Sequence, residues 1–299
     1  MNTECSVAGI RYPRRLLTFA GLVLREMDGK MAFNLASISC DVRQRPPRII
    51  LLGVEKIGKS TFAAGSDRPI FIPVRGEEGI DAIPVPQFPT CNRYSDVIEA
   101  IGSLYSDNHD YGTVCVDSVS ALEPLVLAEV CRIHKSDNIE KVMGGYRKGY
   151  TEALNVWRNI TDGLDALRNE RNMACILIGH TKVKRFDSPD SGSWDQWQFD
   201  MTENAAAMLY RWADVILFAN TKVVIRSEDA GFNKQIKRAI DITNGNRFLY
   251  TQKNPAYPSG GRGAYGMLPA EIPLNWNNFM DAVSAAVKQY DFFGKGYDE

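Results

Sequence analysis

The fold of this chain is decided by one stretch of its sequence, Gly53-Val54-Glu55-Lys56-Ile57-Gly58-Lys59-Ser60. The stretch matches the pattern GxxxxGK[ST], in which glycines let the backbone wrap a phosphate group with its N–H groups pointing inward. An apolar run at 48–52 precedes it, and a helix is expected to open at Ser60. A strand before such a loop and a helix after it separate a phosphate-binding loop from a chance match. The sequence therefore predicts a phosphate-binding loop, to which the helix adds its positive N-terminus.

This loop implies ATP and Mg²⁺ as cofactors. Lys59 is expected to reach the β- and γ-phosphates, and the Ser60 hydroxyl is expected to hold Mg²⁺. The predicted ATP-binding residues are Gly53, Val54, Glu55, Lys56, Ile57, Gly58, Lys59, Ser60 and Thr61.

Strands and helices alternate along most of the chain. Short apolar runs predict strands at 48–52, 69–74, 112–117, 173–178 and 213–218, and helical spacing predicts helices at 94–105, 119–134 and 150–171. Residues 184–203 are polar and rich in Gly, Ser and Asp, so we predict a loop there. Residues 220–265 are β-like, and 275–288 are expected to form a helix. The alternation predicts an α/β fold with a mostly parallel, twisted sheet flanked by helices and a β-rich C-terminal part.

Three regions are expected along the chain: an N-terminal arm at 1–45 that is partly disordered, an ATPase core at 46–275, and a C-terminal helix with an acidic, aromatic tail at 276–299. The segment 1–48 carries eight Lys/Arg and four Asp/Glu. Two alternatives stay open for residues 1–30: they belong to the native product, or Met31 is its true start.

Composition argues against several classes of protein. The net charge is −1, so bulk charge favours neither a nucleic-acid nor a membrane partner, and any basic surface must be local. Six cysteines without a CxxC pair and three histidines without ligand spacing make a zinc site improbable. No apolar run reaches the roughly 20 residues needed to span a bilayer. We expect a cytoplasmic protein, in the bacterial host cytoplasm if it is phage-encoded, with no membrane partner.

Polar residues at strand ends are the candidate catalytic groups. Asp117 ends an apolar strand and is expected to bind the Mg²⁺ shell; the alternative is a cap for the next helix. Glu77 or Glu78, after the second strand, would orient the attacking water, the alternative being a solvated acidic turn. His180 ends the fourth strand, where it would sense the γ-phosphate or serve as a structural histidine.

Two segments, 182–197 and Tyr146–Tyr150, combine cations with aromatic side chains. Cations contact the phosphates of a nucleic-acid backbone, and aromatic rings stack on unpaired bases. The candidate DNA-binding residues are Arg147, Lys148, Lys182, Lys184, Arg185, Trp194 and Trp197. Four aspartates between 187 and 200 oppose this interpretation electrostatically. The alternatives are an ordinary solvated loop and aromatics packed against a neighbouring subunit.

The order of these motifs resembles the RecA-like core ATPases, and most closely the phage AAA-domain nucleotide-binding proteins that act as single-strand annealing recombinases. The matching segments are Gly53–Thr61, Gly76–Ile80, Val114–Ser118, Tyr146–Tyr150, Ile176–Phe186 and Arg211–Ala219. The resemblance covers about residues 46–275, and its most specific strings are His180–Phe186 and Trp212–Ala219.

The resemblance implies a RecA-like P-loop NTPase with ATP at subunit interfaces of a ring or filament. It implies that loops at about 135–149 and 184–203 bind single-stranded DNA. Glu77 falls at the family's catalytic glutamate, and His180 falls where RecA-like proteins usually place a glutamine that couples nucleotide to DNA. A basic residue from a neighbouring subunit is also expected at the γ-phosphate, for which Lys253 and Arg262 are candidates.

The resulting hypothesis is a Mg²⁺-dependent, DNA-stimulated ATPase that binds single-stranded DNA and promotes annealing or homologous recombination in phage DNA metabolism. A single-strand-binding or replication protein is a further expected partner. The alternative is an ATP-switched helicase loader or replication accessory factor that acts through protein contacts. A small-molecule kinase ranks last, because the loop at 184–203 is acidic and aromatic, whereas the lid of such a kinase is rich in arginine.

Overall fold

The structure is a computed structural model that describes residues 45–77, 79–188, 192–229, 235–241 and 245–294. The expected arm at 1–45 therefore lies outside the described residues except for Arg45, and so does Glu78. The expected boundaries of the three regions remain predictions.

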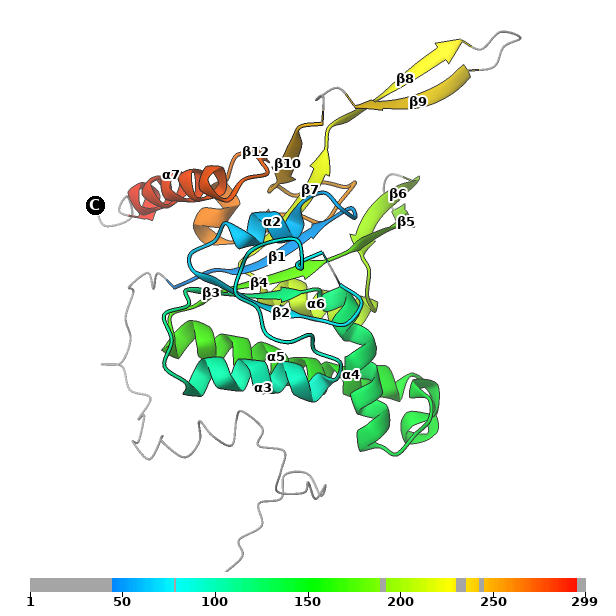
Figure 1. The fold of residues 1–299 in the computed structure, drawn as a ribbon. Helices are drawn as coiled ribbons and strands as arrows, with labels where there is room; N and C mark the ends of the chain where they lie inside the picture. Colours follow the sequence, from blue (N-terminus) through cyan, green and yellow to red (C-terminus); the bar gives the residue numbers. More distant parts are fainter. Residues whose placement is uncertain (1–44, 78, 189–191, 230–234, 242–244, 295–299) are drawn as a thin grey trace, which may run out of the picture.

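A central eight-stranded sheet organises the molecule, and its strand order is β12-β10-β7-β1-β4-β3-β2, with β11 paired to β7 (Figure 1). Five neighbouring strands are parallel: β7 (Val215–Thr221), β1 (Arg48–Gly53), β4 (Ala174–Gly179), β3 (Thr113–Asp117) and β2 (Pro69–Pro73). Three short strands extend the sheet by antiparallel pairing: β10 (Arg247–Tyr250), β11 (Gly260–Gly261) and β12 (Glu271–Pro273). The parallel strands are mostly apolar because helices cover both faces.

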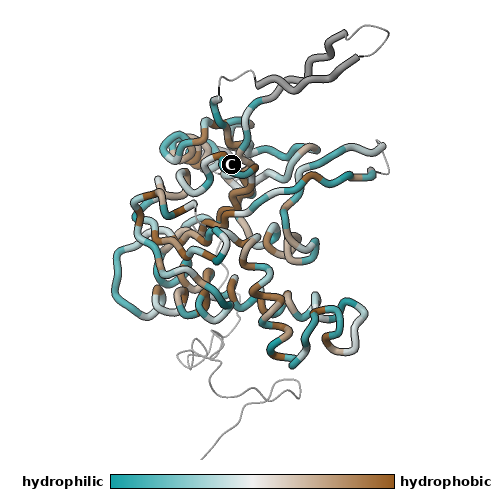
Figure 2. Tube along the Cα trace, turned by 45° about the vertical axis from the view of Figure 1, so that its right-hand side comes forward, coloured by the Kyte–Doolittle hydropathy of each residue, from teal (hydrophilic) through white to brown (hydrophobic). Residues whose placement is uncertain are grey.

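Helices cover the two faces of the sheet unequally. One face carries α3 (Tyr94–Ser106), α4 (Val119–Ile133), α5 (Lys148–Glu170) and α6 (Glu203–Trp212), whose buried residues form one core with the strands. The opposite face carries α2 (Lys59–Ala64) and α7 (Trp276–Gly294), which form the second core. Figure 2 shows hydrophobic stretches gathered along the central strands between these layers. The predicted α/β class, with a mostly parallel sheet flanked by helices, is confirmed.

The prediction of a loop at 184–203 is wrong, because this segment forms most of a β-hairpin. Strands β5 (Thr181–Ser188) and β6 (Gly192–Phe199) pair antiparallel and project beyond the main sheet (Figure 1). The polar composition concealed cross-strand pairs such as Phe186 opposite Trp194, whose ring centroids lie 5.0 Å apart. Such aromatic cross-strand pairs stabilise a hairpin even where most of its residues are polar.

The other segment expected to be a DNA-binding loop, 135–149, is also more ordered than expected. It contains the 3₁₀ helix η2 (Ile139–Gly144), and Lys148 and Gly149 already belong to α5. A second hairpin, β8 (Val223–Asp229) with β9 (Gln235–Asp241), agrees with the predicted β-like character of 220–265. Within the described part of the chain, no helix has the length and apolar character needed to cross a membrane.

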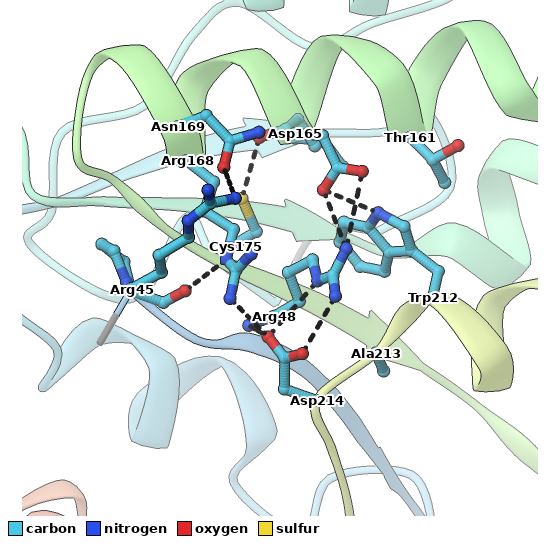
Figure 3. Close-up of polar contacts among 12 residues, drawn as sticks. Arg45, Arg48, Thr161, Asp165, Arg168, Asn169, Cys175, Trp212, Ala213 and Asp214 are labelled. Carbon is cyan, nitrogen blue, oxygen red and sulfur yellow. Dashed lines mark hydrogen bonds and ion pairs between the residues drawn. The ribbon is translucent and has the colours of Figure 1, made fainter. Parts of the chain in front are cut away.

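A largely buried ion-pair network joins α5 to the first residue of β1 and to Asp214, the residue before β7 (Figure 3). The Asp214 side chain is only 8% exposed and forms ion pairs with Arg48 at 2.9 Å and with Arg168 at 3.1 Å. Arg48 also pairs with Asp165 of α5 at 3.1 Å. Burial alone would raise the pKa of Asp214, but hydrogen bonds and charge from Arg48 and Arg168 lower it overall. The network stabilises the amino ends of the parallel strands, opposite the ends that carry the phosphate loop.

Candidate nucleotide and nucleic-acid site

The phosphate loop lies at the carboxyl end of β1, at the edge of the sheet where open α/β proteins bind ligands. Lys59 is the first residue of α2, and its side chain folds back over the loop. Its Nζ donates to the carbonyl oxygens of Gly53 at 3.0 Å and Val54 at 2.9 Å. Lys59 is only 6% exposed, and burial lowers its pKa although Asp117, Glu77 and Glu55 act in the opposite direction. A buried ammonium at the loop is what a phosphate-binding site requires.

Two glycines allow the close approaches that shape the loop. A Cβ on Gly53 would lie 2.4 Å from the carbonyl oxygen of Ala219 on the neighbouring strand. Gly58 has a φ of +105°, which side chains rarely adopt, and its Cβ would lie 2.8 Å from Arg247 Nη1. Larger residues at these two positions would therefore distort the loop.

Ser60 and Asp117 meet at the predicted metal position. The Ser60 hydroxyl donates to Asp117 Oδ2 at 2.5 Å, across the gap between α2 and the end of β3. Burial raises the pKa of Asp117, which is 4% exposed, although the bond from Ser60 acts against this. A hydroxyl and a carboxylate oxygen side by side are ligands of the type that Mg²⁺ prefers, so these two residues fit the ion.

Glu77 is held by two hydrogen bonds from residues at the ends of neighbouring strands. Its Oε1 accepts from the Ser118 hydroxyl at 2.6 Å and lies 2.6 Å from His180 Nε2. Burial would raise the pKa of Glu77, but these bonds and the charges of His180 and Lys59 lower it overall. The carboxyl group is therefore ionised near neutral pH, as a base that orients water must be.

His180 stands between the nucleotide site and the β5–β6 hairpin. It is the single residue between the last residue of β4, Gly179, and the first of β5, Thr181. Its backbone N–H donates to the Ser120 hydroxyl at 3.0 Å, and its carbonyl accepts from Asp200 N at 2.9 Å. Its ring nitrogen Nδ1 is buried and has no hydrogen-bond partner among the described residues. The imidazole therefore has one strong contact, to Glu77.

Sequence reasoning missed a second wall of the nucleotide site, built by the C-terminal strands. Arg247 of β10 donates from Nη1 to the carbonyl oxygen of Ile57 at 2.9 Å, from 190 positions away in the chain. Beside it lies a pocket of about 630 Å³. Its lining includes Thr61 and Phe62 of α2, Asn275 before α7, and Trp276 at the start of α7. The sequence offered only the turn signal Asn244-Gly245 in this region, which does not reveal that the next strand reaches the loop.

Four of the seven candidate DNA-binding residues line one cavity of about 590 Å³: Arg147, Lys182, Lys184 and Trp197. Trp197 is half-buried, and its ring lies 6.2 Å from that of Phe218 in the core.

The other three candidates lie elsewhere. Trp194 packs against Phe186 and donates to Pro255 O at 2.9 Å. Lys148 Nζ donates to the Met143 carbonyl at 3.3 Å, and Arg185 lies 3.7 Å from a carboxylate of its own hairpin. The two tryptophans thus make intramolecular contacts.

Tyr146 is an exposed aromatic residue in Tyr146–Tyr150, the second segment predicted to contact DNA, although it is not one of the seven candidate residues. Its side chain is 94% exposed, and it lies in a run of five residues, 143–147, that all have positive φ. Three of these are not glycine, so the run is strained. It adjoins the cavity through Arg147. The sequence motif Tyr146–Tyr150 does not reveal that the Tyr146 side chain is exposed.

The two candidates for a residue acting on a neighbour's nucleotide differ in their surroundings. Arg262 donates to the backbone carbonyls of Arg211, at 2.6 Å, and Ala213, and lies 3.7 Å from Asp214. Its guanidinium therefore joins the ion-pair network around Asp214, at the ends of the strands opposite the phosphate loop. Lys253 is exposed, three residues beyond the end of β10.

Fold and site together define a P-loop NTPase with an α/β core, in which β4 separates the loop strand β1 from β3, the strand that ends in Asp117. Residues 45–263 match the family model described as "AAA domain", and the chain belongs to this family. No curated protein matches the chain. Among solved structures, the chain is similar to one titled "Crystal structure of the RadB recombinase", with 15% identity and a TM-score of 0.34. The match covers 67% of this chain and 90% of that one.

Proposed function

We propose that the protein is a Mg²⁺-dependent ATPase that binds single-stranded DNA and promotes annealing or homologous recombination in phage DNA metabolism. The observation that supports this most is the contact between Glu77 and His180. This contact connects the candidate nucleotide site to the β5–β6 hairpin, which carries Lys182 and Lys184. A protein whose ATP turnover responds to a bound strand needs such a connection. The motif resemblance adds the recombination role, together with assembly into a ring or filament.

Each residue of the nucleotide site has a part in the proposed reaction. Lys59 leaves the loop carbonyls and binds the β- and γ-phosphates, while Ser60 and Asp117 hold Mg²⁺. When bound, Mg²⁺ neutralises charge on the phosphate oxygens. The pocket beside Arg247 and Trp276 receives the adenine base, because it lies directly against α2. Apolar walls with a few polar groups are typical of such pockets.

Glu77 orients the attacking water, and His180 controls when it does so. Both contacts of Glu77 Oε1 come from the protein, so that oxygen accepts from a water only after one of them is released. A strand bound at the hairpin moves β5, and His180 moves with it because no residue intervenes before β5 begins. Glu77 then exchanges the imidazole for the water. DNA-stimulated hydrolysis is the expected result.

The test compares ATP turnover by the purified protein with and without single-stranded DNA, at several salt concentrations. Stimulation by the strand, strongest at low salt, is expected because phosphate contacts weaken as salt rises. Sizing the protein with ATP and DNA present checks the expected ring or filament. No DNA binding at low salt would reject the proposed function.

Glu77→Gln is expected to lower kcat by about 10²–10⁴-fold, because the amide cannot accept a proton from the attacking water. ATP affinity should be retained, since Lys59 and Ser60 are unchanged. Turnover and ATP-induced thermal stabilisation are the measurements. Glu99→Gln, on the exposed face of α3, is the matched control and should behave as wild type. Normal turnover by Glu77→Gln would remove Glu77 from the catalytic role.

Tyr146→Ala is expected to weaken single-strand binding by about tenfold, because stacking on a base contributes about 1–3 kcal/mol. Basal ATP turnover should not change, because Tyr146 lies outside the nucleotide site. Fluorescence anisotropy with a labelled oligonucleotide measures the loss. Tyr290→Ala on α7 serves as the control. Equal affinities for wild type and Tyr146→Ala would show that this exposed ring does not contact DNA.

A second candidate function, a helicase loader or replication accessory factor, is favoured by one observation. Lys182 and Lys184 are each paired with a carboxylate of their own chain, which reduces attraction for a polyanion. An accessory factor would show slow, DNA-independent hydrolysis and would co-purify with a replication protein. The experiments above separate the two functions.

A further inference from the structure

The cavity lined by Arg147, Lys182 and Lys184 holds two ion pairs that the proposed function does not use. Lys182 Nζ lies 2.8 Å from Asp200 Oδ1, and both side chains are 50% exposed. Lys184 pairs with Glu203, the first residue of α6. Both carboxylates line the cavity as well. Each of the two lysines thus forms an ion pair with a carboxylate that lies outside the β5–β6 hairpin.

A third carboxylate of the cavity serves another purpose. Glu123 of α4 accepts from the backbone N–H of Thr202 at 2.9 and 3.0 Å and from its hydroxyl at 2.7 Å. It therefore caps the beginning of α6 and fixes one wall. Arg147 also lines the cavity and lies over the Tyr150 ring at 6.0 Å, and no ion pair of Arg147 is found in the described part of the chain.

The two lysine pairs are suited to exchange. Ion pairs between exposed side chains contribute little to stability, so neither carboxylate is firmly held. A carboxylate and a phosphodiester both offer an ammonium group oxygens that share a negative charge, at the same short distance. The volume, about 590 Å³, lies in the range of pockets that hold a ligand of nucleotide size.

We propose that Asp200 and Glu203 are internal substitutes for DNA phosphates. They occupy Lys182 and Lys184 in the free protein, and a single strand binds by displacing them, with Arg147 contacting the same backbone. This rests on the proposed function, because it names the phosphate subsite of the strand. It also explains why a DNA-binding hairpin carries paired cations: the carboxylates lower the affinity for any polyanion that cannot displace both.

The test is the double variant Asp200→Asn, Glu203→Gln, with affinity for fluorescein-labelled oligo-dT measured by anisotropy at low and moderate salt. Removing both internal competitors is expected to tighten binding by about tenfold at low salt. The control is Glu99→Gln, Asp110→Asn, which changes the net charge equally at exposed positions outside the cavity. It is expected to change affinity by no more than about twofold.

Lys182→Ala, Lys184→Ala should lose binding in both the wild-type and the Asn/Gln background, and thermal melting confirms that each variant is folded. An equal gain in the control would show a general charge effect and overturn the inference. Tighter binding of polyglutamate than of oligo-dT would also overturn it, because the cavity would then receive an acidic protein. If wild type binds DNA and the Asn/Gln variant binds no more tightly, only this inference falls. If neither binds DNA, the proposed function falls with it.

Discussion

Lys59→Ala is expected to abolish measurable ATP hydrolysis, with a fall in turnover of at least about 10²–10³-fold. The Lys59 ammonium is buried at the phosphate loop and bonded to two of its carbonyls. In the proposed complex the γ-phosphate replaces those carbonyls, and the charge of Lys59 stabilises the negative charge that spreads over the phosphate oxygens. Alanine supplies neither charge nor hydrogen bond, so ATP binding also weakens.

Turnover and the ATP-induced rise in melting temperature together check this expectation. Lys288→Ala, on the exposed surface of α7, removes an equal charge and should leave both quantities unchanged. Hydrolysis retained by Lys59→Ala would overturn the assignment of the active site.

Asp214→Ala is expected to have the largest effect on stability, lowering the free energy of unfolding by about 3–5 kcal/mol. The side chain is 8% exposed and receives Arg48 and Arg168, which would be left as buried charges with too few acceptors. For a chain of this size the melting temperature should fall by on the order of 10 °C. Denaturant titration and thermal melting measure the effect.

The exposed pair between Asp67 and Arg68 provides the control. Their side chains are 70% and 57% exposed, so Asp67→Ala should cost less than about 1 kcal/mol. The folded pKa of Asp214 lies below its unfolded value of about 3.8, so its contribution is present above that pH and is lost as the pH falls through the folded pKa. Wild type should therefore lose stability more steeply than Asp214→Ala below about pH 4. Equal stability of the two at neutral pH would show that the network is not stabilising.

The parallel core was predictable because its signals are local. The strand at 48–53 contains the continuous apolar run 49–52, and such runs occur where helices cover both faces of a sheet. The phosphate loop was predictable for the same reason, because eight consecutive residues carry the whole motif. The long helix α5 followed from its apolar spacing.

What the sequence did not show depends on contacts between distant segments. The β5–β6 hairpin is held by cross-strand pairs, which composition conceals. Trp197 was predicted to stack on bases, but a sequence gives no sign that Phe218 will lie beside it. The contact between Glu77 and His180 spans 103 positions, and only the order of parallel strands brings the two together.

The bond from Arg247 to Ile57 has a consequence for how the chain is made. Synthesis proceeds from the N-terminus, so the phosphate loop leaves the ribosome long before Arg247 and Trp276 exist. A nucleotide stabilises a protein only in proportion to its affinity for the folded site, and the second wall of this site is absent until then. A chain released early, before residue 247, keeps the loop but gains little protection from ATP. In the proposed nucleotide complex, ATP therefore stabilises the finished chain more than a chain that ends before residue 247.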